Sequence, residues 1–253
     1  FQYPYFKPGA GPNAVSEIET RAVADFAFDH PNIAVVFTFT PEDNLFHPWA
    51  PDGNSDNAAI KWAIHSDDAP YHAFLAERYR EIHGGKDAPS VGAEGSFATW
   101  AYFHFGRWSL AARAWWPTSK DDSIPWTEVK HPDFPDRKVE VGGLKPFATL
   151  NPPAKELDPL AEKHLAALGK LVELLPSIRL EVKSEELGEG VRRVTATVIN
   201  DGYLPTMPEM GRLSGEHHPL QIRIDGAKIV TGFPRVQVER LAGNGGKVAH
   251  SWL

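Results

Sequence analysis

The final part of the chain consists of short runs in which apolar and polar residues alternate, with glycine, asparagine and proline between the runs. The runs cover residues 178–182, 191–199, 220–224, 228–231, 236–241 and 248–253. A period of two places successive side chains on opposite faces of a β-strand. Several short strands joined by turn residues are typical of a sandwich of two sheets. We therefore predict an all-β sandwich domain over residues 178–253.

The first part of the chain has a different pattern, in which a helical stretch precedes an apolar strand. Ser16 and Glu19 have the spacing of a capping box, which indicates the start of a helix. Residues 33–39 form an apolar run rich in β-branched residues, as in strands that are buried on both faces. A second helix is expected to begin at Asp68 and to end before Gly84. Helices that alternate with a buried strand predict an α/β fold with a mixed sheet.

Two further stretches connect these parts. Residues 117–157 are rich in proline, aspartate and lysine without periodic burial, which is typical of a wrapping linker or an insert. Asp158 and Pro159 are residue types preferred at the N-cap and first position of a helix. The predicted organisation is an α/β unit over residues 1–145, a linker and helix over residues 146–177, and the sandwich over residues 178–253.

The composition argues against several classes of protein. The net charge is −7 and no run of lysine and arginine is present, so nucleic acid is not an expected partner. No window approaches about 18 consecutive apolar residues, and no membrane span is predicted. The absence of cysteine removes disulfides, thiol nucleophiles and cysteine-held metals, but it leaves the compartment open. The 21 glycines and 22 prolines argue against a helical bundle.

The sequence lacks the motifs of common active sites. Its 11 histidines are scattered, and the adjacent pair His217-His218 would point to opposite faces of a strand. No H-E-x-x-H, G-x-S-x-G, phosphate-loop or dinucleotide motif occurs. The aromatic residues between Trp100 and Trp116 either line a groove for sugars or peptides or pack in the core. Both alternatives stay open at this point.

Two segments resemble the zinc metallocarboxypeptidase family. Residues 11–33 are similar to the helix that precedes the central strand of that family. Residues 95–116 are similar to the stretch that leads to its strand with the catalytic glutamate. Residues 38–45 take the place of the strand end and turn that carry its last zinc ligand. The sandwich also fits, because residues 198–206 resemble a strand and turn of the β-domains that many members append. The resemblance therefore implies the distal part of a carboxypeptidase-like α/β domain followed by a β-sandwich.

The same resemblance implies that zinc chemistry is lost in this chain. Active members hold zinc with an early H-x-x-E motif and a later histidine, and a glutamate acts as the general base. The early motif would lie upstream of Phe1, and Thr40 stands at the position of the later histidine. Arg113 stands at the glutamate position, where a guanidinium cannot accept a proton near neutral pH and would repel the metal. Thr99 stands where an acidic residue often lines the specificity pocket. No cofactor is therefore expected here, although active members of the family use zinc.

The leading hypothesis is a catalytically inactive carboxypeptidase homologue or fragment that binds a peptide or a small anionic ligand. The expected ligand cleft contains Thr40, Asn44, Thr99, Tyr102 and Arg113. Arg113 would hold a carboxylate by two hydrogen bonds, and the alternative for this residue is a buried ion pair with an aspartate or glutamate. Two other functions stay open. One is an active zinc carboxypeptidase that is completed by a missing amino-terminal half, and the other is a glycan- or surface-binding protein.

The resemblance also bears on partners and compartment. Half of an α/β sheet would expose the strand at residues 33–39, and such an edge usually needs a partner. We expect the chain to associate with its missing half, a second copy or another protein. The chain begins with Phe1 and ends within its last expected strand, which is compatible with truncation at both ends. The residues leave the compartment unknown, and the family favours a secreted or periplasmic protein.

Overall fold

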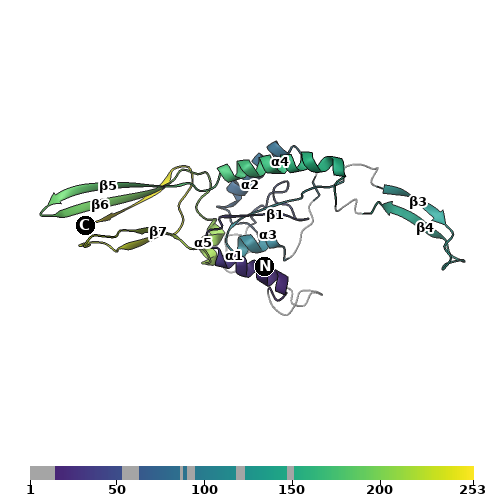
Figure 1. The fold of residues 1–253 in the computed structure, drawn as a ribbon, viewed down its shortest axis with the longest axis horizontal. Coiled ribbons are helices and arrows are strands. Elements are labelled where there is room, and N and C mark those ends of the chain that lie inside the picture. Colours follow the sequence, from purple (N-terminus) through teal and green to yellow (C-terminus); the bar gives the residue numbers. More distant parts are fainter. Residues whose placement is uncertain (1–14, 53–62, 86–87, 90–94, 118–122, 147–150) are drawn as a thin grey trace.

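The computed structural model describes residues 15–52, 63–85, 88–89, 95–117, 123–146 and 151–253. The molecule is elongated, with a helix-rich centre, a hairpin at one end and the C-terminal strands at the other (Figure 1). Its elements, in chain order, are α1 (Ile18–Asp29), β1 (Val35–Phe39), α2 (Ala69–His83), α3 (Phe97–Phe103), β2 (Trp108–Ala112), β3 (Ser123–Val129), β4 (Val139–Leu144), α4 (Ala154–Glu173), β5 (Ile178–Gly188), β6 (Val191–Asn200), α5 (Glu209–Ser214), β7 (Leu220–Arg223), β8 (Arg235–Val238) and β9 (Gly246–Trp252).

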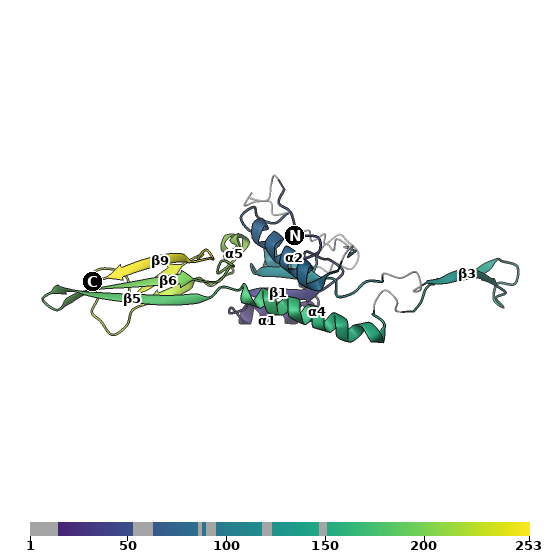
Figure 2. The ribbon, with the colours of Figure 1, turned by 90° about the horizontal axis from the view of Figure 1, so that it is seen from above.

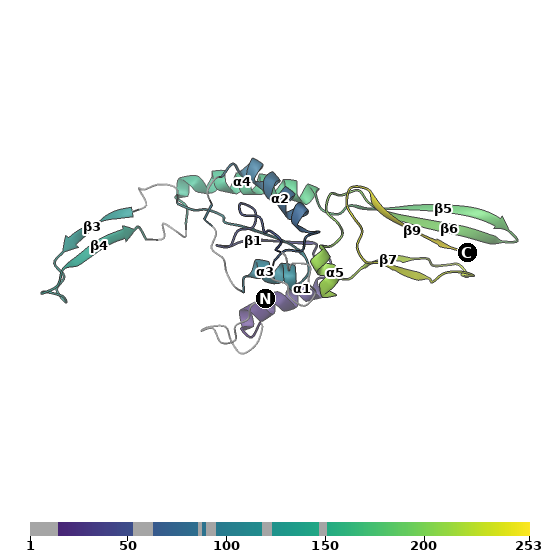
Figure 3. The same cartoon turned by 180° about the vertical axis from the view of Figure 1, so that it is seen from behind.

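The centre of the molecule is a layered α/β unit built around two parallel strands. β1 pairs with β2 in a register that runs from Val35 opposite Trp108 to Phe39 opposite Ala112. All five residues of β2 are buried, as expected for a parallel strand covered on both faces. α2 and α4 lie on one side of these strands and α1 and α3 on the other (Figures 1 and 3). The predicted α/β architecture is therefore confirmed at this level.

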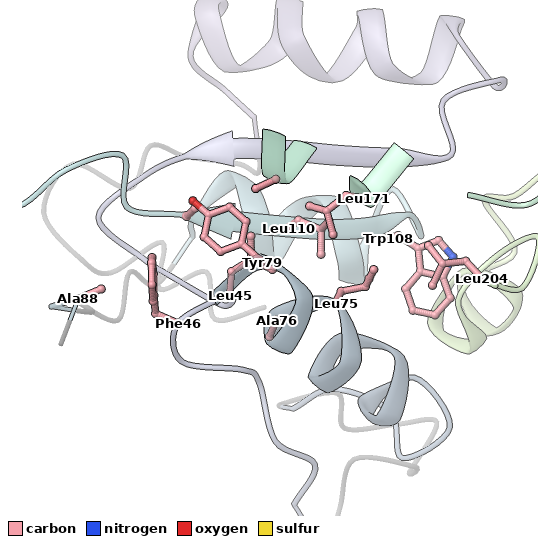
Figure 4. Packing of buried hydrophobic residues seen from close by; sticks show 12 residues of the cluster. Leu45, Phe46, Leu75, Ala76, Tyr79, Ala88, Trp108, Leu110, Leu171 and Leu204 are labelled. Carbon is pink, nitrogen blue, oxygen red and sulfur yellow. The ribbon is translucent and has the colours of Figure 1, made fainter. Parts of the chain in front are cut away.

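The core of the α/β unit lies between the strands and the helices α2 and α4 (Figure 4). Trp108 and Leu75 are fully buried in it, together with Leu204 from the C-terminal part of the chain. The indole nitrogen of Trp108 donates a hydrogen bond to the carbonyl oxygen of Pro205 at 3.2 Å. The same core thus holds the segment after β6 against the centre of the molecule.

The helix boundaries agree with the sequence prediction for α2 and differ for two other helices. α2 has a proline in its first turn and ends at Gly84, whose φ of 68° is the left-handed conformation that glycine adopts without strain. α1 begins at Ile18 without a side-chain cap, so the predicted capping box is not formed. α4 begins at Ala154, so Asp158 is not its N-cap and Pro159 lies inside the helix. The buried residues of α4, His164, Ala167 and Leu171, all lie after the proline, and the first turn is tied to the α/β unit by the hydrogen bond from the indole nitrogen of Trp115 to Glu156.

The stretch predicted as a linker contains an antiparallel hairpin of β3 and β4. Its residues are mostly exposed on both faces, so it shows no pattern of burial that the sequence could reveal. Trp126 is 67% exposed and lies across the backbone of Gly142 and Gly143. The stretch interpreted as a wrapping linker or an insert therefore contains regular structure, because pairing between the two strands stabilises the segment without a core.

The C-terminal part contains two antiparallel sheets, with strand orders β5-β6-β9 and β7-β8. They share an apolar core to which Val198, Ile222, Val238 and Trp252 contribute. This arrangement is compatible with the predicted sandwich. The run at residues 228–231 is not a strand, and α5 was not predicted from the sequence. Among the helices that the structure describes, none has the length and apolar character needed to span a membrane.

A histidine of α2, His72, is deeply buried in the centre of the molecule. It is 1% exposed, and neither ring nitrogen has a hydrogen-bond partner among the residues that the structure describes. Its ring lies among the aromatic rings of Trp49, Tyr102 and Trp108, with centroid separations of 5.6 to 5.7 Å. Burial lowers the pKa of His72 to about 3, because a charged imidazole loses its hydration there.

This burial predicts a loss of stability in acid. The unfolded chain binds a proton at His72 near pH 6.5, whereas the folded chain binds it only near pH 3. The contribution of neutral His72 to the free energy of unfolding is therefore fully present above about pH 6.5, and it decreases as the pH falls toward about 3. From about pH 7 to about pH 5, His72 is expected to account for about 2 kcal/mol of lost unfolding free energy. Urea unfolding of His72→Phe should show a pH dependence smaller by that amount, whereas the exposed-site variant His131→Gln should match the wild type. An unchanged pH dependence in His72→Phe would contradict this account.

Candidate ligand-binding site

The candidate site lies at the carboxyl ends of β1 and β2, where open α/β sheets usually place their ligands. Thr40 follows β1 and Arg113 follows β2, and these strands are paired up to Phe39 and Ala112. The backbone N–H of Thr40 donates to the carbonyl oxygen of Ala112 at 3.2 Å. The structure therefore brings together the two positions at which the resemblance places a zinc ligand and a catalytic glutamate.

Arg113 is anchored by its backbone and keeps a partly exposed side chain. Its backbone N–H donates to Oδ2 of Asp43 at 2.8 Å, and its guanidinium donates through Nη1 to the carbonyl oxygen of Pro89 at 3.4 Å. Within the described part of the chain, no carboxylate forms an ion pair with this guanidinium. The alternative of a buried ion pair is thus not seen among these residues, and the remaining N–H groups of Arg113 can bind an anion.

Asp43 fixes the loop that carries Thr40, and the sequence analysis did not single it out. Its Oδ1 accepts hydrogen bonds from the backbone N–H groups of Leu45 at 2.9 Å, Phe46 at 2.5 Å and His47 at 3.3 Å. Its other oxygen accepts the bond from Arg113, and the residue is 2% exposed. This carboxylate therefore organises the loop and is not available as a general base. A proline-bounded loop after a strand was the only signal in the sequence.

Asn44 and Tyr102 were expected near the mouth of the cleft, but both are completely buried. The side-chain amide of Asn44 donates to the carbonyl oxygen of Ser109 at 2.9 Å and accepts from the backbone N–H of Ala111 at 2.8 Å. It therefore bonds to the backbone of β2 in the way that a paired strand would. The hydroxyl of Tyr102 donates to Oδ2 of Asp68 at 2.7 Å. Both polar groups are used inside the fold, so the structure does not place them in contact with a ligand.

Thr99 lies in the first turn of α3, close to a carboxylate from another segment. Its hydroxyl lies 2.8 Å from that of Ser96 and donates to Oε1 of Glu42 at 3.3 Å. Glu42 is 9% exposed, and within the described segments its Oε2 has no hydrogen-bond partner. An acidic group therefore lies beside the position where the resemblance places an acidic pocket residue. The sequence did not reveal it, because Glu42 and Thr99 are far apart along the chain.

A buried polar cluster from α2 and α4 lies beneath the same strand ends. Nε2 of His164 lies 2.8 Å from the carbonyl oxygen of Ala114, so this nitrogen carries the proton. The hydroxyl of Tyr79 therefore donates to Nδ1 of His164, at 2.9 Å. The ring of His83 lies 4.7 Å from that of His164. The sequence analysis treated these histidines as scattered, because only the packing of the two helices brings them together.

Burial keeps two members of this cluster, Tyr79 and His83, uncharged. Burial, followed by the negative charge of Asp43, raises the pKa of Tyr79 far above its ordinary value of 10.0. Burial, assisted by His164, lowers the pKa of His83 to about 4. The hydroxyl of Tyr79 and the imidazole of His83 are therefore both neutral near pH 7 beneath the candidate site.

The donor groups at the strand ends do not fit a zinc ion. The hydroxyl of Thr40 is a poor zinc ligand, and the guanidinium of Arg113 is a fixed positive charge. In the part of the chain that the structure describes, no three His, Asp or Glu side chains are placed to hold one metal ion. The expectation that this chain binds no zinc nevertheless stays a prediction, because only a measurement on the protein tests it.

Comparisons with known proteins give a family match for one region of the chain. A family model described as a domain of unknown function, DUF8731, matches residues 179–253. No curated protein and no solved structure matches the chain. The match begins within β5 and covers the C-terminal strands, so the chain is similar to that family in this region.

Proposed function

We propose that the chain is a carboxypeptidase-like binding module that holds a carboxylate at the ends of β1 and β2 without zinc-dependent hydrolysis. The observation that supports this most is the position of Arg113 at the carboxyl end of β2, beside Thr40. Its backbone is fixed by Asp43, and its guanidinium has a single long hydrogen bond to a described residue. A C-terminally free peptide or a small organic anion fits this group.

The chemistry of the guanidinium makes the ligand class specific. A planar guanidinium can bind both oxygens of a carboxylate with two parallel hydrogen bonds. Hydrogen bonds to charged groups contribute about 1.5 to 3 kcal/mol, which corresponds to an affinity change of about tenfold to a hundredfold. A neutral amide at the same position offers one acceptor oxygen and no charge. The module should therefore distinguish a free carboxylate from its amide.

The test uses a library of short peptides in two forms, one with a free C-terminus and one with an amidated C-terminus. Wild-type chain should prefer the free form of its best ligands, as measured by calorimetry. Arg113→Ala should weaken binding of the free form by about tenfold to a hundredfold and weaken binding of the amidated form much less, because the neutral amide loses one hydrogen bond. Arg113→Lys keeps the charge without the planar geometry. Its affinity for the free form should lie between the affinities of the wild type and of Arg113→Ala. Equal affinity of wild type and Arg113→Ala for free peptides would refute the proposed site.

The aromatic stretch gives less support to a glycan-binding module. Trp108 and Tyr102 are completely buried, and Trp100 stacks on Phe105 with centroids 5.6 Å apart. Trp115 donates through its indole nitrogen to Oε2 of Glu156 at 3.2 Å. These contacts favour packing as the main purpose of the stretch. The active-peptidase alternative depends on residues outside this chain, and the measurement of zinc described in the Discussion addresses it.

The proposal includes a protein partner along β1. Among the described residues, β1 pairs with β2 alone, and α1 and α4 lie beside it in the view from above (Figure 2). Both helices expose apolar side chains, with Ile18 77% exposed on α1 and Leu165 73% exposed on α4. An open strand edge between apolar helices favours association with further polypeptide, whether a missing half, a second copy or another protein.

A further inference from the structure

The longest strand of the molecule lies at an open sheet edge. β5 is 11 residues long, and every residue in it is exposed. It pairs with β6 on one side and forms the edge of the sheet β5-β6-β9 (Figure 2). It contains no proline, and its register with β6 shifts only near its end, between Glu186 and Gly188. A long, regular and exposed edge of this kind is a template for pairing with another strand.

One face of β5 extends the apolar core of the C-terminal strands without being covered. Leu180 is paired with Val198 and Val182 with Ala196, so these two side chains lie on the core face of the sheet. They are nevertheless 57% and 59% exposed. The facing sheet has two strands, whereas this sheet has three. The column of side chains on β5 therefore lacks the cover that β6 and β9 have.

The opposite face of β5 carries charges in an order that is complementary to itself. Arg179, Glu181, Lys183 and Glu185 alternate in sign and are arranged around Val182. If two β5 strands pair antiparallel about a twofold axis at Val182, Arg179 lies opposite Glu185 of the second copy. Glu181 then lies opposite Lys183 of the second copy. Such directly opposite pairs of unlike charge stabilise a sheet.

The charges also favour the register around Val182 over the two registers whose axis is shifted by one residue. A shift of the axis to Glu181 places Glu181 opposite itself and Arg179 opposite Lys183 of the second copy. A shift to Lys183 places Lys183 opposite itself and Glu181 opposite Glu185. Like charges directly opposite each other are destabilising. A single register therefore matches all four charges and keeps the apolar faces of both copies on the same side.

The charges involved remain accessible within one chain. Arg179 already bonds to Asp201 through Nε at 2.8 Å, and Glu185 lies 3.1 Å from Nη1 of Arg193. Pairing would extend these exposed contacts into networks across the two copies. Lys183 forms no ion pair with another residue of the described chain and would gain its first one from Glu181 of the second copy.

From this pattern we infer that β5 is a self-association edge, through which two copies join antiparallel around Val182 into one six-stranded sheet. The pairing places Val182 of both copies side by side on the core face and brings Leu180 opposite Ser184 of the second copy. It buries the unpaired backbone edge of β5 and part of its apolar column. The inference is independent of the proposed carboxylate site. That site lies at the carboxyl ends of β1 and β2, whereas the segment after β6 packs at their amino ends, where Trp108 bonds to Pro205.

Sedimentation velocity over a wide range of chain concentration tests this inference. The wild-type chain should form a dimer that weakens as salt is raised, because the pairs are exposed. Lys183→Glu places like charges opposite each other twice per dimer and should weaken the dimer by about tenfold or more. The exchange of both charges, Glu181→Lys with Lys183→Glu, restores the unlike pairs and should recover dimerisation. Both positions, Glu181 and Lys183, are exposed, so circular dichroism is enough to check that the variants fold.

Leu165→Glu on α4 provides the matched control, because it disrupts the other exposed apolar surface. It should leave the β5 dimer intact. A wild-type chain that stays monomeric at all concentrations would overturn the inference. Loss of the dimer in Leu165→Glu but not in Lys183→Glu would also overturn it, as would the formation of open-ended aggregates instead of dimers.

Discussion

Replacing Asp68 with alanine is expected to lower the free energy of unfolding by about 4 kcal/mol. The carboxylate is completely buried and accepts hydrogen bonds from the hydroxyl of Tyr102 at 2.7 Å and from the backbone N–H groups of Glu209 at 2.7 Å and Met210 at 3.0 Å. The guanidinium of Arg240 lies 3.8 Å away. Removal of the carboxylate takes the acceptor away from the buried hydroxyl of Tyr102 and from the backbone N–H groups of Glu209 and Met210, which is costly.

The measurement is urea unfolding followed by circular dichroism. Asp68→Asn keeps one accepting oxygen and should lose less stability than the alanine variant. Asp133→Ala, at a side chain that is 80% exposed, is the matched control and should stay within about 0.5 kcal/mol of the wild type. A loss below about 1 kcal/mol in Asp68→Ala would show that Asp68 does not join α5 to α2 and α3 as described.

Gly202→Ala is expected to destabilise the chain by about 3 kcal/mol. A Cβ atom at Gly202 would meet the carbonyl oxygen of Leu175 and would lie 2.7 Å from the backbone nitrogen of Ser177. These are backbone atoms between the end of α4 and the start of β5, so they cannot move aside as a flexible side chain would. The close approach holds the turn after β6 against the end of α4.

Gly169→Ala is the control for this prediction, because a Cβ atom at Gly169 meets nothing within 4 Å. Gly169 lies inside α4, where alanine is preferred over glycine by about 1 kcal/mol. Thermal unfolding should therefore show opposite shifts for the two variants. Equal stability of Gly202→Ala and the wild type would contradict the packing described here.

The parts of the fold that could be predicted from the sequence are those with a local cause. α2 was predicted from the proline in its first turn and the glycine that follows its last turn. β5 and β6 were predicted from the alternation of apolar and polar residues. The β3–β4 hairpin was missed because it has no buried face to impose a pattern. The start of α4 was misplaced because the helix begins at Ala154, before the Asp158-Pro159 pair that has the residue preferences of a helix start.

The candidate site was predictable in the same limited sense. Parallel pairing of neighbouring strands brings their ends together, so Thr40 and Arg113 meet as expected. Asn44 and Tyr102 were misjudged because burial depends on which distant groups, such as Ser109 and Asp68, satisfy their hydrogen bonds. No pattern along a single segment reports such long-range pairing.

The central proposal is that the ends of β1 and β2 present an anion-binding guanidinium at the positions where the zinc carboxypeptidases that the sequence resembles hold zinc. Elemental analysis of zinc per chain, after incubation with excess zinc and extensive dialysis, tests it most directly. The account predicts a ratio near zero, because Thr40 and Arg113 do not form a zinc site. Retention of one zinc ion per chain would contradict the account and would favour a metal-dependent peptidase instead.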